Sequence, residues 1–126
     1  MATTTLLLAE DEALVIELLE PELTDAGFEV ISVRNGNDAL AELDAGAARF
    51  RAVIADIKLG KGPDGWEVGR RAREHVSDMP VVYMSGDSDH EWSSKGVPNS
   101  LMVTKPFAPS QIVTAVSMLI TAADTT

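Results

Sequence analysis

Acidic, hydroxyl and lysine side chains follow four separate apolar runs of this sequence. Glu10–Glu12 follow the first run, Asp56 ends the third, Ser85–Gly86 end the fourth and Lys105 follows the fifth. Two carboxylates about 4 Å apart repel each other by about 4 kcal/mol at an effective dielectric near 20. A pocket that gathers several of them therefore needs a divalent cation, or one acid must stay protonated. Oxygen ligands with room for water suit Mg²⁺ better than Ca²⁺.

A carboxylate beside Mg²⁺, a lysine and a serine hydroxyl form a set suited to phosphoryl transfer, because the transition state spreads negative charge over its oxygens. Asp56 would be the nucleophile, and Lys105 would place a positive charge on one phosphoryl oxygen. Ser85 would donate a hydrogen bond to another oxygen, and Gly86 would leave space for the incoming group. The sequence has no nucleotide-binding loop of the G-x-x-x-x-G-K-[ST] type, so the phosphoryl group must arrive on an activated donor.

Alternating strand-like and helix-like segments would position these residues. Short runs rich in Val, Ile or Leu predict buried strands at Thr5–Ala9, Glu29–Val33, Ala52–Ile57, Pro80–Met84 and Ser100–Thr104. Helices are predicted at 12–26, 38–45, 64–76 and 88–95 and from Pro109 onward. This order predicts an α/β fold with a doubly wound parallel sheet, flavodoxin-like (βα)5 with strand order 2-1-3-4-5. The carboxyl ends of its strands would bring the polar residues to one edge.

The helices differ in how clear their patterns are. The first is expected to bury one face that carries Leu14, Leu18, Leu19 and Leu23. Asp64 is a predicted N-cap for the third helix. The segment 88–95 is polar, contains three serines and predicts only a short, weak helix.

The chain has 126 residues, a formal net charge of -10 and 45% apolar residues, which predict one globular domain over residues 1–126. A nucleic-acid backbone is bound by a basic face, so the excess of acids argues against DNA or RNA as a partner. No apolar run approaches the roughly 18 residues of a membrane helix, and no basic segment opens a signal peptide. We therefore expect a cytoplasmic protein with no membrane partner. The absence of cysteine excludes disulfides and thiolate metal sites.

Four motifs, in this combination and order, make the sequence resemble the receiver domains of two-component response regulators. The motifs are Leu7–Glu12, Asp56 with Leu59-Gly60 and Asp64-Gly65, Met84–Gly86, and Lys105–Phe107. The resemblance covers essentially the whole chain and leaves no segment for an output domain. It implies a single-domain response regulator, CheY-like in fold, that works in phosphorelay signal transduction.

The resemblance also implies partners and ligands for individual residues. A histidine kinase or histidine phosphotransfer protein would pass a phosphoryl group from its histidine to Asp56, which would become an aspartyl phosphate. Mg²⁺ would be held by Asp11, Asp56 and the main-chain carbonyl of Lys58, with Glu10 acting through water. The peptide bond before Pro106 would be cis, a conformation that X-Pro bonds adopt at small cost.

A receiver of this kind is not an enzyme that turns over an external substrate. It promotes its own phosphorylation and dephosphorylation. Phosphorylation would draw Ser85 and Lys105 inward and shift the population of the nearby loops. The signal would leave through contacts with a downstream protein that the sequence does not identify.

Some positions depart from the family's pattern. The family usually has Tyr or Phe three residues before the lysine, where this chain has Met102. Tyr83 lies two residues before Ser85 on the same face of its strand. We interpret Tyr83 as ordinary packing, with replacement of the missing aromatic residue as the alternative. Lys58 and Asp87 occupy positions that tune hydrolysis in the family, but a surface lysine and a helix N-cap explain them equally well.

Two other functions compete with this interpretation. Gly60–Gly65 reads G-x-G-x-x-G, the fingerprint of dinucleotide-binding proteins. Asp56 and Lys58 break the strand that should run apolar into the first glycine, and Asp64 would repel a pyrophosphate, so we favour a flexible loop. The second alternative is a receiver-like scaffold that is not phosphorylated, which Met102 leaves open.

Overall fold

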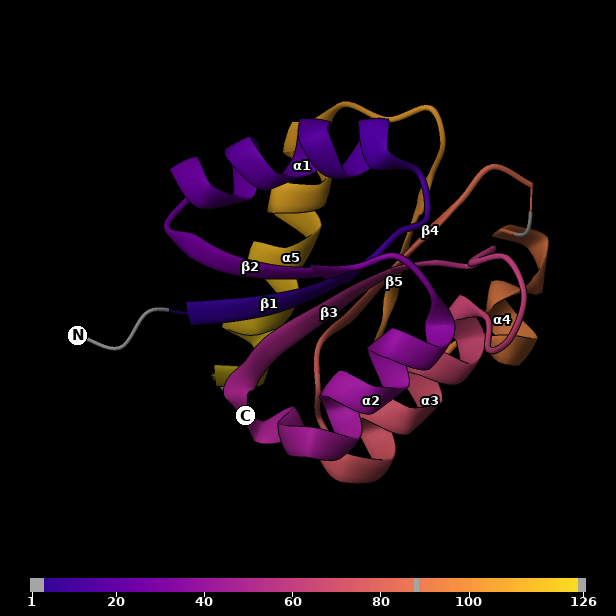
Figure 1. Ribbon diagram of the computed structural model, residues 1–126. Helices are drawn as coiled ribbons and strands as arrows, with labels where there is room; N and C mark the ends of the chain where they lie inside the picture. The colour runs from indigo at the N-terminus through magenta and orange to yellow at the C-terminus, as the bar shows by residue number, and fades with distance from the viewer. Residues whose placement is uncertain (1–3, 88, 125–126) are drawn as a thin grey trace.

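The strands form one parallel sheet in the order β2-β1-β3-β4-β5 (Figure 1). The structure is a computed structural model, and it describes residues 4–87 and 89–124. The strands are β1 (Thr4–Ala9), β2 (Phe28–Val33), β3 (Phe50–Asp56), β4 (Val81–Ser85) and β5 (Leu101–Thr104). Every pairing between neighbouring strands is parallel. The predicted strands and their order are confirmed, with ends that shift by one or two residues.

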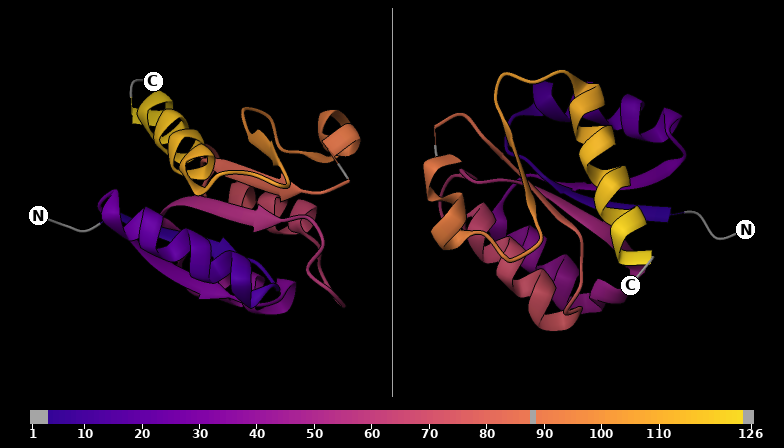
Figure 2. Two further views of the ribbon diagram at one scale, coloured as in Figure 1. Left: turned by 90° about the horizontal axis from the view of Figure 1, so that it is seen from above. Right: turned by 180° about the vertical axis from the view of Figure 1, so that it is seen from behind.

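Helices cover both faces of the sheet. They are α1 (Ala13–Asp25), α2 (Gly36–Gly46), α3 (Gly65–His75), α4 (Trp92–Lys95) and α5 (Pro109–Asp124), with short 3-10 helices η1 (Ala47–Arg49) and η2 (Asp89–Glu91). The views in Figure 2 show α1 and α5 on one face and α2, α3 and α4 on the other. This is the flavodoxin-like arrangement that the sequence predicts. Among the described residues, no helix combines the length and the apolarity needed to cross a bilayer.

Successive residues of the strands pack into different layers, because side chains alternate between the two faces of a sheet. In β1, Leu6 and Leu8 are buried beneath α1 and α5, whereas Leu7 and Ala9 are buried beneath α2 and α3. Each fully buried leucine contributes roughly 2 kcal/mol of transfer free energy. The result is a firmly packed sheet whose carboxyl edge holds the ends of β1, β3 and β4 in place.

The buried face of α1 differs from the predicted one. Ile16, Leu19 and Leu23 are buried, but Leu14 and Leu18 are 72% and 60% exposed. At 3.6 residues per turn, Leu14 and Leu18 lie roughly opposite the stripe formed by the three buried residues. The prediction was wrong for these two leucines because α1 carries apolar residues on two faces and the sheet can cover only one of them.

The segment before β5 forms little helix, as its sequence predicts. Residues Asp89–Glu91 make a 3-10 turn, Trp92–Lys95 make one α-helical turn, and Ser88, where the predicted helix begins, lies outside the described residues. The Trp92 indole packs against the core on the α3 side, and its Nε1 donates a 2.9 Å hydrogen bond to the Ser100 hydroxyl. A side-chain anchor, rather than a long helix, thus holds this segment on the sheet.

Candidate functional site

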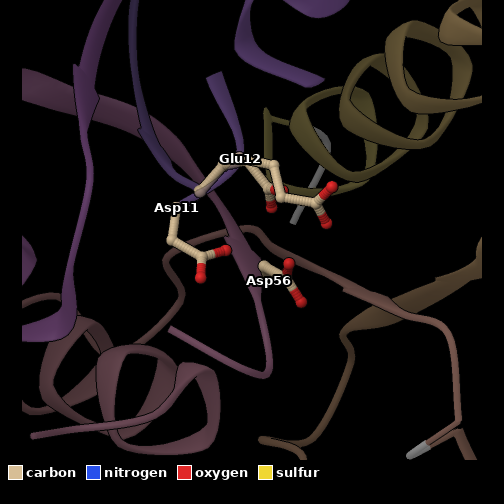
Figure 3. Close-up of side chains that lie close together, drawn as sticks. Asp11, Glu12 and Asp56 are labelled. Carbon is tan, nitrogen blue, oxygen red and sulfur yellow. The ribbon is translucent and has the colours of Figure 1, made fainter. Parts of the chain in front are cut away.

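Four carboxylates meet where β1 and β3 end. Glu10, Asp11, Glu12 and Asp56 each place one oxygen atom within 4.8 Å of the others. Figure 3 shows the labelled side chains of Asp11, Glu12 and Asp56 gathered around one point. The two strands are neighbours, with Ala9 paired to Ala55, so the residues that follow them reach the same edge. Glu10 and Asp56 are buried, whereas Asp11 and Glu12 are exposed.

The Asp56 carboxylate is oriented by a donor on each of its oxygens. The main-chain N–H of Lys58 donates to Oδ1 at 3.2 Å, and the ammonium group of Lys105 donates to Oδ2 at 2.7 Å. Only 5% of Asp56 is exposed to solvent. The carboxylate is therefore fixed at the end of β3 with its oxygens toward the cluster.

Lys105 is the cation within the cluster. Its Nζ lies 2.7 Å from Asp56, 3.2 Å from Glu10 and 3.4 Å from Glu12, in each case measured to a carboxylate oxygen. Burial lowers the pKa of Lys105, but the hydrogen bond and charge of Asp56, together with Glu10, raise it by more. The net pKa is above its ordinary value, so the ammonium group stays charged and offsets part of the acids' repulsion.

Glu10 is the most strongly perturbed acid of the site. Its pKa is raised from 4.5 to about 8; burial is the largest cause, the nearby Asp56 carboxylate adds to it, and Lys105 opposes it. Within the described residues, no hydrogen-bond donor reaches the buried Oε2 of Glu10. An unpaired buried oxygen beside three further carboxylates is a donor set that fits a hard metal ion. The cluster can therefore bind a divalent cation.

A cleft of about 420 Å³ opens in front of Asp56. It is lined by Asp11, Glu12, Asp56, Lys58, Ser85, Gly86, Asp87 and Lys105. The Ser85 hydroxyl accepts a 3.2 Å hydrogen bond from the Asp87 amide, and the Ser85 carbonyl accepts one of 2.7 Å from the Lys105 amide. A Cβ added at Gly86 would meet nothing within 4 Å. Across the mouth of the cleft, the Lys58 ammonium group lies 2.7 Å from Asp87.

The structure brings the predicted acceptor, metal-binding and phosphoryl-stabilising residues to this one edge. They are Glu10, Asp11, Asp56, Lys58, Ser85, Gly86 and Lys105. The expected cis peptide bond between Lys105 and Pro106 is present. The geometry places the residues together, and their roles in chemistry stay predictions at this point.

Met102 and Tyr83 lie beside each other but outside the lining of the cleft. They are paired positions on β5 and β4. Tyr83 is fully buried, its ring centroid is 4.8 Å from that of Trp66, and its hydroxyl accepts a 3.1 Å hydrogen bond from the Val97 amide. These contacts give Tyr83 a packing role, and they tie the segment before β5 to β4.

The Tyr83 hydroxyl is expected to stabilise the fold measurably. Tyr83→Phe leaves the buried Val97 N–H without its acceptor, which costs about 1–3 kcal/mol. Urea unfolding measures the difference. Ser94→Ala is the matched control, because the Ser94 hydroxyl donates a hydrogen bond of the same 3.1 Å length on the exposed surface. Equal unfolding midpoints for Tyr83→Phe and the wild type would contradict this role.

Two site contacts have no counterpart in the predictions from sequence. The Arg34 guanidinium donates to the main-chain carbonyl of Asp11 from Nε at 3.2 Å and from Nη2 at 2.8 Å. Glu12, which the sequence places near the site without a ligand role, reaches Lys105. Arg34 directly follows the edge strand β2. Its place at a strand end was the one feature of the sequence that could have indicated a contact with the site.

The glycine-rich loop does not offer a free anion site at the start of α3. The Asp64 side chain accepts a 3.0 Å hydrogen bond from the Glu67 amide, which confirms the predicted N-cap. A pyrophosphate would have to compete with that carboxylate for the amides of the first turn. The loop geometry therefore favours the interpretation of Gly60–Gly65 as a connecting loop.

Comparisons with known proteins agree on one family. Residues 6–117 match the family described as the response regulator receiver domain. A crystal structure of a response regulator receiver protein from Sinorhizobium medicae is 48% identical, covers 95% of this chain and 96% of its own, and superposes with a TM-score of 0.91.

More distant matches include a solved structure and a curated sequence. The receiver domain of the sensor histidine kinase PA1611 from Pseudomonas aeruginosa, solved with a magnesium ion coordinated in its active-site cleft, is 21% identical. It covers 94% of this chain and 98% of its own, with a TM-score of 0.79. The transcriptional regulatory protein GltR of Pseudomonas aeruginosa is 30% identical over 92% of this chain and 48% of its own length. The chain thus spans about half the length of the curated relatives it matches.

Proposed function

This chain belongs to the response regulator receiver domains, and from that premise we propose that Asp56 accepts a phosphoryl group from a phosphohistidine. The donor would be a histidine kinase or a histidine phosphotransfer protein in the cytoplasm. An Asp56 oxygen attacks phosphorus while the bond to the histidine nitrogen breaks, and the electron pair of that bond returns to the imidazole. The observation that carries the proposal is the Asp56 carboxylate, buried and held between the Lys58 amide and the Lys105 ammonium group.

The neighbouring residues can stabilise the charge that develops on the phosphoryl oxygens. Lys105 already lies 2.7 Å from one Asp56 oxygen, so it can bind a phosphoryl oxygen attached there. Ser85 lines the same cleft and can donate its hydroxyl proton to a second oxygen. Gly86 keeps the entrance free of a side chain.

We propose Mg²⁺ as the cation of this site. Asp11 and Asp56 would bind it directly, together with the main-chain carbonyl of Lys58, and Glu10 would act through water. The unpaired buried Oε2 of Glu10 supports this arrangement. When bound, Mg²⁺ would neutralise the carboxylates and supply positive charge to the phosphoryl oxygens.

The domain is a phosphoacceptor that promotes its own phosphorylation and hydrolysis, and in this proposal it signals through protein–protein contacts as a single-domain regulator. The new charge on Asp56 would draw Ser85 and Lys105 inward and shift the loops that follow β4 and β5. Met102 would leave this shift without the aromatic residue that usually accompanies it.

Intact-mass measurement after incubation with Mg²⁺ and acetyl phosphate tests the acceptor. We expect the wild type to gain one phosphoryl group and Asp56→Asn to gain none. Asp44→Asn is the matched control, since Asp44 is an exposed aspartate that pairs with Arg71 and His75, outside the cleft. It should gain the group as the wild type does. No gain by the wild type from acetyl phosphate or from a phosphorylated kinase would contradict the proposal and favour an unphosphorylated scaffold.

A further inference from the structure

Arg34 contacts the main chain of the segment Glu10–Glu12, called the acidic segment below. Two N–H groups of its guanidinium converge on one atom, the Asp11 carbonyl oxygen, at 2.8 and 3.2 Å. We propose that Arg34 is a positioning residue that holds the Asp11 carboxylate ready for the metal ion. This inference rests on the function proposed above, because it concerns the same site.

Asp11 lies at a gap between two regular elements. The Glu10 amide still donates to the Val33 carbonyl of β2, at 3.1 Å. The Glu12 carbonyl already serves α1, where it accepts from the amides of Val15 and Ile16. The Asp11 carbonyl belongs to neither the sheet nor the helix. Its contact with Arg34 therefore fixes a peptide group of this connection that the regular hydrogen bonds of sheet and helix do not hold.

Arg34 is itself anchored on both sides. It follows Val33, the last residue of β2, and it precedes Asn35, whose side chain caps α2 by accepting a 2.7 Å hydrogen bond from the Asp38 amide. A guanidinium group is planar and presents its N–H groups in a fixed fork, so little freedom is lost when two of them bind one oxygen. The end of β2 and the start of α2 thus fix the position of Arg34, and Arg34 in turn holds the acidic segment.

The charge of Arg34 and its positioning role predict opposite changes in Mg²⁺ affinity when Arg34 is removed. A positive guanidinium near an acidic cluster opposes a cation, so charge alone predicts tighter Mg²⁺ binding without it. Loss of positioning predicts weaker binding, because the Asp11 carboxylate would sample more orientations. Residues that orient metal ligands typically change metal affinity by about 10–100-fold. We expect positioning to dominate, with a loss near the lower end of that range.

Calorimetric titration with Mg²⁺ measures the affinity directly, without any phosphoryl transfer. Arg34→Ala should weaken binding by about tenfold. Arg34→Lys keeps the charge, which opposes a cation, and loses the fork, so it should also bind Mg²⁺ more weakly than the wild type. Arg49→Ala is the matched control, because Arg49 is also an exposed arginine that donates to main-chain carbonyls, those of Gly46 and Glu42, and it does not line the cleft. It should bind Mg²⁺ as the wild type does.

Amide hydrogen exchange of residues 10–13 without metal gives a second, independent readout. Arg34→Ala should exchange faster in this segment, and Arg49→Ala should not. Binding that is unchanged or tighter in Arg34→Ala, with exchange like that of the wild type, overturns the inference and leaves the proposed function standing. If the wild type binds no Mg²⁺, the proposed metal site is wrong, and the exchange rates alone decide whether Arg34 positions the segment.

Discussion

In the absence of Mg²⁺, the protein is expected to become less stable as the pH rises from about 5 to about 8. The cause is Glu10. Its pKa is raised from 4.5 to about 8 in the folded protein, mainly by burial. Between these values the folded state keeps a proton that the unfolded state has released. Stability therefore falls with rising pH, by at most about 1.4 kcal/mol per pH unit for one proton. Lys105 adds no slope in this range, because its pKa is raised above its ordinary value of 10.5.

Mg²⁺ should oppose this loss, since a bound cation favours the ionised form of a nearby carboxylate. We therefore expect the stabilisation by Mg²⁺ to increase over the same pH range. Chemical unfolding at several pH values, with Mg²⁺ and with a chelator, measures both effects. Glu10→Gln is the matched variant, because glutamine has the shape of the protonated acid and does not titrate. Its metal-free stability should be flatter with pH, and parallel curves for wild type and variant would contradict the role of Glu10.

Much of the fold follows from short-range patterns in the sequence. The inner strands β1, β3 and β4 are buried on both faces, so each carries an apolar run, such as Ala52–Ala55 in β3, that marks its position. The same reasoning fails for α1, where leucines on both faces give one helix two apolar stripes. Only the sheet decides that Ile16 and Leu19 are buried and that Leu14 and Leu18 are exposed.

In the candidate site, too, some features can be predicted from the sequence and others cannot. Asp56 and Lys105 are predictable because each interrupts or follows an apolar run at a strand end, and the topology then brings the strand ends together. Arg34 contacts a main-chain carbonyl 23 residues away, and a carbonyl group has no signature in the sequence. The raised pKa of Glu10 is equally hidden, because it depends on how completely neighbouring elements bury the side chain.

Gly65→Ala is expected to disrupt the fold and the acceptor site together. Gly65 begins α3, and its amide donates a 2.9 Å hydrogen bond to the Ile57 carbonyl just after β3. A Cβ at this position would overlap the Asp56 carbonyl and lie 2.8 Å from the Ile57 Cα. These are main-chain atoms, so no side-chain rotation can relieve the overlap. The start of α3 would have to move away from the end of β3, and Asp56 would move with it.

Two opposing effects decide the size of the change. Alanine stabilises a helix interior by about 1 kcal/mol relative to glycine, and by less at a first position. Overpacking typically costs about 1–3 kcal/mol, and a clash with rigid main-chain atoms lies at the upper end of that range. The net effect is therefore a loss of stability. Urea unfolding and the acetyl phosphate mass assay should show a lower midpoint and a loss of phosphorylation in the same variant. Gly86→Ala is the control for stability alone, because its added Cβ meets no atom within 4 Å. A wild-type midpoint for Gly65→Ala would show that α3 and β3 are less tightly coupled than this contact requires.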